Sequence, residues 1–200
     1  MADRGMVTIE SELKTAFPPV VGPGARLLIL GSMPGEASLR QRQYYGHPRN
    51  AFWPILSALL GMPTQASYAE RCAVLVARGI ALWDVIAACE RPGSLDQAIR
   101  PETVRVNDFR TFFEARPGII QLVFNGGTAE REYRRRVLPA LQPPQREIQR
   151  HRLPSTSPAH ASLRFEQKLA AWGSILDWLG IDQVEPLRPD DQGFTCISAP

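Results

Sequence analysis

The sequence predicts an α/β domain in which helices cover both faces of a mostly parallel sheet. Three short apolar runs, at 26–30, 80–86 and 119–124, have the continuous apolar character of strands that are buried on both faces. Segments with apolar residues at helical spacing lie between and after these runs. Such an alternation is typical of parallel strands that are joined by helices.

In the first half of the chain, each expected element has its own signal. Residues 1–20 are expected to form a short amphipathic lead-in that ends at two prolines. Helix 51–60 carries apolar residues at helical spacing, and helix 68–78 repeats this pattern and ends at Gly79. The second strand, 80–86, follows directly.

In the second half of the chain, glycine and proline mark most of the boundaries. A helix is expected at 107–114 before the third strand, and an arginine-rich helix is expected at 128–138 after it. Residues 146–152 are predicted to form a weaker, edge-like strand. A long helix is expected at 162–179, because Gly180 follows its last apolar position.

Length and composition are those of one globular domain with a substantial core. The chain has 200 residues, of which 44% are hydrophobic and 22% are charged. We expect a single domain over 1–182. The tail, 183–200, is rich in Pro and Asp without periodicity and is expected to be disordered.

Composition also bounds the cellular setting. No apolar run approaches the length of a membrane span, and the polar N-terminal residues lack the apolar region of a secretory signal, so no membrane partner is expected. The three scattered cysteines argue against a disulfide framework and a Cys-ligated metal site. A reduced, cytoplasmic setting is therefore expected.

A long polar segment, 31–50, follows the first strand. It is rich in Gly, Pro, Ser, Tyr, His and Asn, and a connection of this length without secondary structure is uncommon unless it is functional. Ligands of open α/β sheets bind at the carboxyl ends of the strands. Two further polar loops, 125–127 and 153–161, follow later strands and are expected to share this edge.

Positive charge is concentrated late in the chain. The net charge is only +3, yet residues 131–152 hold seven arginines and His151 against two glutamates. A solvated helix face would explain a charge run on its own. Arginine also offers a planar fork that suits phosphate, and the cluster lies next to the loop at 153–161.

Several common catalytic motifs are absent from the sequence. There is no GxGxxG, no P-loop and no GxSxG, which argues against a dinucleotide-binding protein, a P-loop nucleotidase and an α/β-hydrolase. The three histidines lack ligand spacing, so no metal is expected. The loops hold neutral polar groups suited to reading a base edge and holding a water: Ser32, Asn50, Asn125, Ser155 and Ser157.

Four motifs occur in these loops in one particular order. They are GSMPG at 31–35, HPRNAFW at 47–53, FNG at 124–126 and STSP at 155–158. In this order they resemble the uracil-DNA glycosylase superfamily, and most closely its hypoxanthine-DNA glycosylase (DNA-deoxyinosine glycosylase) branch, over roughly residues 25–180. The resemblance implies a three-layer α/β/α sandwich with a central four-stranded parallel sheet.

The resemblance also implies a reaction on DNA that contains deaminated bases. A nucleotide is flipped out of the duplex, and its N-glycosidic bond is hydrolysed by a monomeric enzyme that needs no cofactor. Hypoxanthine is the first expected substrate, with uracil or xanthine as alternatives. The motifs hold no lysine, so no Schiff-base step is expected. Two other classes stay open: a nucleic-acid-binding module without catalysis, and a hydrolase of small nucleotides.

The resemblance assigns the catalytic water to Asn50 and Ser32. Asn50 is expected to orient the water, because Ser32 stands where other branches carry Asn or Asp. Asn50 could instead cap the helix that follows it, and one side chain can serve both roles. Ser32 could likewise contact the water or cap its turn.

Five residues are expected to bind the base. Phe52 is expected to stack on it, with core packing as the alternative. Asn125 is expected to read its edge, with a left-handed turn residue as the alternative. The remaining wall of the pocket is assigned to Tyr45, Gly31 and Met33.

Four residues near the last motif are expected to bind DNA. Ser155 and Ser157 are assigned to phosphate, with a turn role as the alternative, and Arg164 is included with them. His160 stands where Asn is expected in this branch, and it could enter the duplex, contact phosphate or help to protonate a purine. Asp84, at the end of the second strand, is interpreted as structural.

Overall fold

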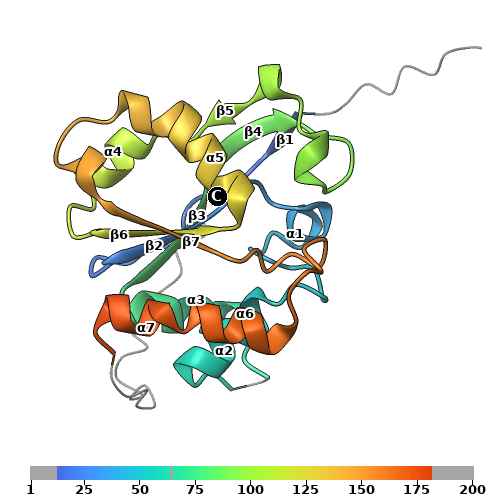
Figure 1. The fold of residues 1–200 in the computed structure, drawn as a ribbon, viewed down its shortest axis with the longest axis vertical. Coiled ribbons are helices and arrows are strands. Elements are labelled where there is room, and N and C mark those ends of the chain that lie inside the picture. Colours follow the sequence, from blue (N-terminus) through green and yellow to red (C-terminus); the bar gives the residue numbers. More distant parts are fainter. Residues whose placement is uncertain (1–12, 64, 182–200) are drawn as a thin grey trace, which may run out of the picture.

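A four-stranded parallel sheet forms the centre of the computed structural model, which describes residues 13–63 and 65–181 (Figure 1). Its strands are, in spatial order, β3 (Ile80–Asp84), β2 (Leu27–Gly31), β6 (Gln121–Asn125) and β7 (Gln149–Leu153). The register pairs Gly31 with Asp84 at the carboxyl ends of β2 and β3. Polar residues that end the strands therefore lie along one edge of the sheet.

Helices cover both faces of this sheet, which confirms the predicted three-layer fold (Figure 1). One face carries α2 (Phe52–Leu60), α3 (Tyr68–Ala77), α6 (Phe165–Trp172) and α7 (Ser174–Leu179). The other carries α4 (Phe109–Glu114) and α5 (Gly127–Glu132), which a π-helical turn, Tyr133–Val137, continues. The remaining helical elements are α1 (Glu36–Gln41) and the 3₁₀ turns Asp96–Ala98, Pro101–Thr103, Leu138–Ala140 and Gln145–Glu147.

A second, three-stranded antiparallel sheet was not predicted. It consists, in spatial order, of β1 (Leu13–Thr15), β4 (Ile86–Glu90) and β5 (Arg105–Val106). Part of the expected lead-in is therefore a strand, and residues 1–12 lie outside the described part of the chain.

The prediction of one strand over 80–86 is wrong. The chain leaves the central sheet after Asp84, and Val85 and Ile86 donate hydrogen bonds to the carbonyls of Gly31 (2.9 Å) and Ser32 (3.0 Å). Both sides of this break are apolar and buried, so the sequence carries no boundary signal there.

Three other expectations differ from the structure. The polar segment 31–50 contains α1, so it is not free of secondary structure. The helix expected at 162–179 is two helices that meet at Gly173, a poor helix former. The helix expected at 128–138 loses its regular α pattern before Pro139, which has no N–H to donate. The expected tail, 183–200, lies outside the described residues.

The core packs against both faces of the central sheet. Residues 27–30 of β2 are completely buried. On one face Phe52 of α2 meets Trp172 of α6 edge-on, with ring centroids 5.8 Å apart. Large buried side chains of this kind stabilise a fold by about 2–3 kcal/mol each. Within the described residues, no helix has the length and apolar character needed to cross a membrane.

Candidate active site

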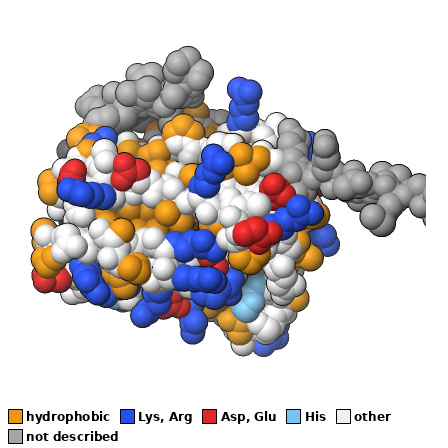
Figure 2. Space-filling view, turned by 90° about the horizontal axis from the view of Figure 1, so that it is seen from above, with side chains coloured by type: hydrophobic (Ala, Val, Ile, Leu, Met, Phe, Trp, Pro, Cys, Tyr) orange, Lys and Arg blue, Asp and Glu red, His pale blue; other side chains and the backbone are white. Residues whose placement is uncertain are grey.

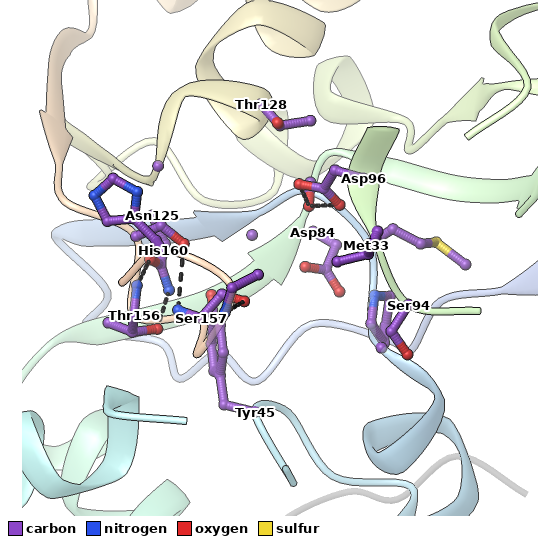
Figure 3. A pocket seen from close by; sticks show the side chains of 18 of the residues that line it. Met33, Tyr45, Asp84, Ser94, Asp96, Asn125, Thr128, Thr156, Ser157 and His160 are labelled. Atoms are coloured by element: carbon purple, nitrogen blue, oxygen red, sulfur yellow. Dashed lines mark hydrogen bonds between the residues drawn. The ribbon is translucent and has the colours of Figure 1, made fainter. Parts of the chain in front are cut away.

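The carboxyl ends of the central strands open into a cavity of about 1030 Å³ (Figure 3). Three of its walls come from the polar loops that the sequence analysis placed at this edge: 31–50, 125–127 and 153–161. Residues 94–97 form a further wall that was not predicted. The volume lies at the upper end of the range for ligand pockets.

The loop after β2 is held by a buried arginine. Arg91 is 1% exposed, and its guanidinium donates to the backbone carbonyls of Met33 (3.4 Å) and Pro34. At the start of the loop, a Cβ on Gly31 would collide with Oδ1 of Asp84. The close approach of these two strand ends therefore requires glycine, and both Gly31 and Met33 line the cavity.

Ser32 is bonded to a carboxylate from another part of the chain. Its hydroxyl donates to Oδ1 and Oδ2 of Asp96, each at 2.9 Å. Asp96 also lies 3.8 Å from the guanidinium of Arg91. Because the serine proton is directed at Asp96, the lone pairs of the serine oxygen can accept a hydrogen bond from a water in the cavity.

Asn50 lies in the cavity wall at the start of α2. Its Oδ1 accepts a hydrogen bond from the backbone N–H of Phe52 at 3.0 Å. This bond closes a turn directly before α2, whose N-cap residue is Ala51. For its Nδ2 group, the described part of the chain supplies no partner, so this side chain can serve the helix and still donate to a ligand.

The structure places Tyr45 at the cavity wall, where it was expected, and Phe52 behind it. Phe52 is completely buried and is not part of the cavity wall, which corresponds to the core packing given as its alternative role. Tyr45 lines the cavity and stacks on Phe52, with ring centroids 3.8 Å apart and planes at 20°. The backbone of Tyr45 is left-handed, with φ of 55°. The neighbouring Tyr44 is anchored by the indole N–H of Trp53, which donates to its carbonyl at 2.8 Å.

Asn125 joins the end of β6 to the last loop. Its Oδ1 accepts from the backbone N–H of Thr156 (2.9 Å), and its Nδ2 donates to the hydroxyl of Thr156 (2.8 Å). The next residue, Gly126, has φ of 94°, and a Cβ there would lie 2.8 Å from Cβ of Ser155. Asn125 keeps its second Nδ2 hydrogen, so it can still contact a base edge.

The residues expected to bind phosphate lie at the cavity but also shape their own loop. Ser155 Oγ accepts from the N–H of Ser157 (3.2 Å), and Ser157 Oγ accepts from the N–H of Ala159 (3.2 Å). His160 lines the cavity as well, and its carbonyl accepts from Lys168 (2.8 Å). Arg164 is exposed at the start of α6 and is not part of the cavity wall.

Arginines surround the rim of the cavity. They are Arg131, Arg134, Arg135 and Arg152. Figure 2 shows Lys and Arg side chains gathered on one face of the molecule, among a few acidic ones. Glu130 pairs with two of them, Arg134 at 2.9 Å and Arg152 at 3.3 Å. The rim therefore keeps an excess of positive charge, which suits a phosphate backbone.

Asp84 lies in the cavity wall at the end of β3, where the sequence analysis treated it as structural. It is 3% exposed, and its Oδ2 has no hydrogen-bond partner among the described residues. Burial raises the pKa of Asp84 to about 8; nearby Asp96 adds to the increase and Arg91 opposes it. The signal in the sequence was a carboxyl group that ends an apolar strand, at the same edge as Ser32 and Asn125.

Three other residues of the site escaped the sequence analysis: Arg91, Asp96 and Thr156. Nothing in the spacing connects Asp96 with Ser32, which lies 64 positions earlier. In the ranges that the structure describes, no group of three or more His, Cys, Asp or Glu side chains is placed to hold a metal ion.

Two curated proteins resemble this chain in sequence. The hypoxanthine DNA glycosylase of Methanosarcina barkeri is 40% identical to this chain over 114 residues, which cover 56% of this chain and 71% of that protein. The hypoxanthine DNA glycosylase of Methanosarcina acetivorans is 38% identical over 118 residues, 58% of this chain and 73% of that protein.

A solved structure has the same fold. The solution NMR structure of a proposed uracil DNA glycosylase from Methanosarcina acetivorans superimposes with a TM-score of 0.69 and 31% identity, covering 84% of this chain and 99% of that one. The sequence profile of the uracil DNA glycosylase superfamily matches residues 18–179. These matches confirm the predicted resemblance and the predicted enzyme class, a DNA glycosylase. The chain belongs to the uracil DNA glycosylase superfamily.

Proposed function

We propose that this protein is a monofunctional glycosylase that removes deaminated bases from DNA, hypoxanthine first, with uracil or xanthine as the alternative substrates. One observation carries the proposal: Asn50, the Ser32–Asp96 pair and Asn125 face a single cavity whose rim is arginine-rich. The relatives named above as hypoxanthine DNA glycosylases support the order of substrates. One chain supplies every wall of the cavity, which supports action as a monomer.

The attacking water is assigned to the wall that holds Asn50 and Ser32. As the N-glycosidic bond breaks, its electron pair leaves with the base and positive charge develops on the sugar at C1′. The water oxygen then bonds to C1′, and the proton that it loses passes through the hydroxyl of Ser32 to the carboxylate of Asp96. The departing base takes up a proton from solvent. Holding the water in line with C1′ removes much of the entropic cost of this step.

The base is assigned to the space beside Tyr45. In this arrangement Tyr45 provides the stacking surface and Phe52 supports it from behind. Asn125 contacts the base edge with its second Nδ2 hydrogen. A flipped base has left its partners in the duplex, so these contacts offset part of the cost of unstacking it.

The phosphates on either side of the flipped nucleotide are assigned to the loop that holds Ser155 and Ser157, and to the arginine rim. Hydroxyl and guanidinium groups are common phosphate ligands in DNA complexes. His160 lies at the same edge of the cavity. Arg164, which is exposed outside the wall, is assigned to more distant phosphates.

The test is single-turnover excision from duplexes that contain inosine, uracil or xanthine, followed by alkaline cleavage of abasic sites. We expect strand scission on inosine first and a loss of about 10²-fold or more in the Asn50→Ala variant. Gln142→Ala, which changes an exposed amide outside the four motifs and outside the cavity wall, is the matched control and should keep the wild-type rate.

The results of this assay distinguish a DNA glycosylase from the alternative functions. No scission on any duplex would overturn the proposal and favour a binding module without catalysis. A faster rate on uracil than on inosine would reverse the proposed order. Activity on free deoxyinosine without activity on DNA would favour a small-nucleotide hydrolase. A wild-type rate in Asn50→Ala would show that Asn50 does not orient the attacking water.

A further inference from the structure

The backbone of Asp84 is held by hydrogen bonds, and its carboxyl group lies in the cavity wall. Its main-chain carbonyl accepts from Nδ2 of Asn107 at 2.7 Å, and its strand is paired in register with β2. The side chain lines the cavity and approaches Gly31 so closely that no other residue fits there. Figure 3 shows the carboxyl group between Asp96 and Tyr45. It is therefore held in position, not free to turn into solvent.

One buried polar atom at this place lacks a partner. Oδ2 of Asp84 forms no hydrogen bond with any residue in the described ranges. The hydroxyl of Tyr45 is buried beside it, and the side chain of Asn125 interacts with this hydroxyl. A Cβ on Gly31 would lie 3.0 Å from the tyrosine hydroxyl and would collide with the carboxyl group, so both groups converge on the same spot. Buried polar groups without partners are rare in native proteins, and in a cavity they indicate contact with a ligand.

The charged and titratable groups around Asp84 come from three segments. Asp96 belongs to the 3₁₀ turn, Arg91 follows β4, and Tyr44 and Tyr45 follow α1. Burial dominates over all of them and raises the pKa of Asp84 to about 8. Near neutral pH the group is therefore mostly a carboxylic acid, which has one O–H donor and a carbonyl acceptor.

We propose that Asp84 binds the lactam edge of the flipped base, with one carboxyl oxygen accepting the ring N–H and the other donating its proton to the adjacent exocyclic oxygen. The inference rests on the proposed function and adds a group that separates hypoxanthine and uracil from their amino parents, adenine and cytosine. Hypoxanthine offers this edge at N1–H and O6, and uracil offers it at N3–H and O4. Replacement of an amino group by a carbonyl oxygen creates the edge, so it is the feature that these bases share.

Ionisation of Asp84 removes this contact. A carboxylate has no donor, and its second oxygen would face the exocyclic oxygen of the base, which is also an acceptor. An asparagine at the same place would keep one acceptor and one donor without titrating. Asp84→Asn is therefore the variant that separates recognition by a neutral acid from a structural role for the aspartate.

The experiment measures single-turnover excision of inosine from a duplex between pH 6 and pH 9.5 for three proteins. With a pKa of about 8, the neutral fraction of Asp84 falls about tenfold between pH 7 and pH 9, and we expect the wild-type rate at subsaturating enzyme to fall by the same factor. Asp84→Asn should keep a rate within about threefold of wild type at pH 7 and lose this fall. Asp84→Leu should lose about 10²-fold at all pH values.

The controls address folding and the substrate. Asp177→Asn, an exposed aspartate in α7, should match the wild-type pH profile. The lactam N–H of the base also ionises at alkaline pH, but a fall from that source is common to wild type and Asp84→Asn. If Asp84→Leu does not fold, the comparison of wild type with Asp84→Asn still decides.

Each failure has its own signature. Wild-type protein that excises no base at any pH overturns the proposed function itself. Wild-type protein that excises inosine, with Asp84→Asn showing the same alkaline fall or Asp84→Leu showing the wild-type rate, overturns only the role of Asp84.

Discussion

The hydroxyl of Ser32 donates to both carboxylate oxygens of Asp96, at 2.9 Å each. This contact joins the loop after β2 to the 3₁₀ turn Asp96–Ala98. The short side chain of Ser32 is thereby paired with a carboxylate that a different loop supplies.

We expect Asp96→Ala and Ser32→Ala each to lower the single-turnover excision rate by about 10²-fold, because either change breaks the route by which the water loses its proton. The double variant should lose little more than either single one, since the two residues act as a unit. Asp96→Asn should fall between, because its carbonyl oxygen accepts the serine proton but cannot take it up. Glu102→Gln, an exposed change, is the control. Wild-type activity in Asp96→Ala would exclude the relay.

We expect Arg91 to contribute mainly to the stability of the fold, because it holds the loop after β2. Arg91→Met should lower the free energy of unfolding by about 3 kcal/mol, because the carbonyls of Met33 and Pro34 lose their donor and Asp96 loses a buried cation. Urea denaturation measures the change. Arg110→Met, which removes an exposed pair with Glu114, should cost less than about 1 kcal/mol. Equal costs for both variants would contradict the supporting role of Arg91.

We expect substitutions of Phe52 to affect mainly stability and substitutions of Tyr45 to affect mainly excision. Phe52→Ala should destabilise the fold by about 3–5 kcal/mol, as expected for a fully buried aromatic residue. Tyr45→Ala should cost less stability and slow excision, whereas Tyr45→Phe keeps the stacking ring and should retain most of the rate. Thermal unfolding and single-turnover rates, taken together, make the comparison. Normal excision by Tyr45→Ala would mean that the base stacks elsewhere.

The arginine rim should set the salt dependence of DNA binding. Replacing Arg131 and Arg135 together by Ala should weaken binding and reduce the slope of log Kd against log salt by about 2, because two phosphate contacts are lost. Fluorescence anisotropy on an undamaged duplex measures this without catalysis. Arg110→Ala, on α4, is the matched control. An unchanged slope would mean that Arg131 and Arg135 do not contact phosphates and that DNA binds to another face of the protein.

The predictions from the sequence succeeded where the signal was local or belonged to a motif. The apolar runs at 26–30 and 119–124 overlap β2 and β6, which begin one and two residues later, because a buried parallel strand needs apolar residues on both faces. The loops that end these strands meet at one cavity because parallel strands point the same way. The hydrogen bond from the N–H of Phe52 to Asn50 is local as well, since donor and acceptor are two residues apart.

Other parts of the site depend on contacts between distant residues. Asp96 reaches Ser32 only because β4 carries the chain back past the loop after β2, and no pattern in 80–86 announces that β4 belongs to another sheet. Phe52 was assigned to the base from a motif, but the motif does not tell which side of the ring Tyr45 will cover. The environment of Asp84 could not be read at all, because its burial is a property of the assembled fold.

The turn at Val85 and Ile86 has a mechanical consequence. Two backbone hydrogen bonds tie these residues to Gly31 and Ser32, so the small sheet is anchored to the loop after β2. Asp84 lies just before this turn, and Asp96 follows β4 at the start of the 3₁₀ turn. The length of the segment between them, which contains β4, therefore helps to set the separation of the two acids. Inserting or deleting a single residue in β4 would shift one acid against the other while leaving the four-stranded sheet intact. We therefore expect a one-residue insertion in this stretch to lower activity more than a conservative substitution within it.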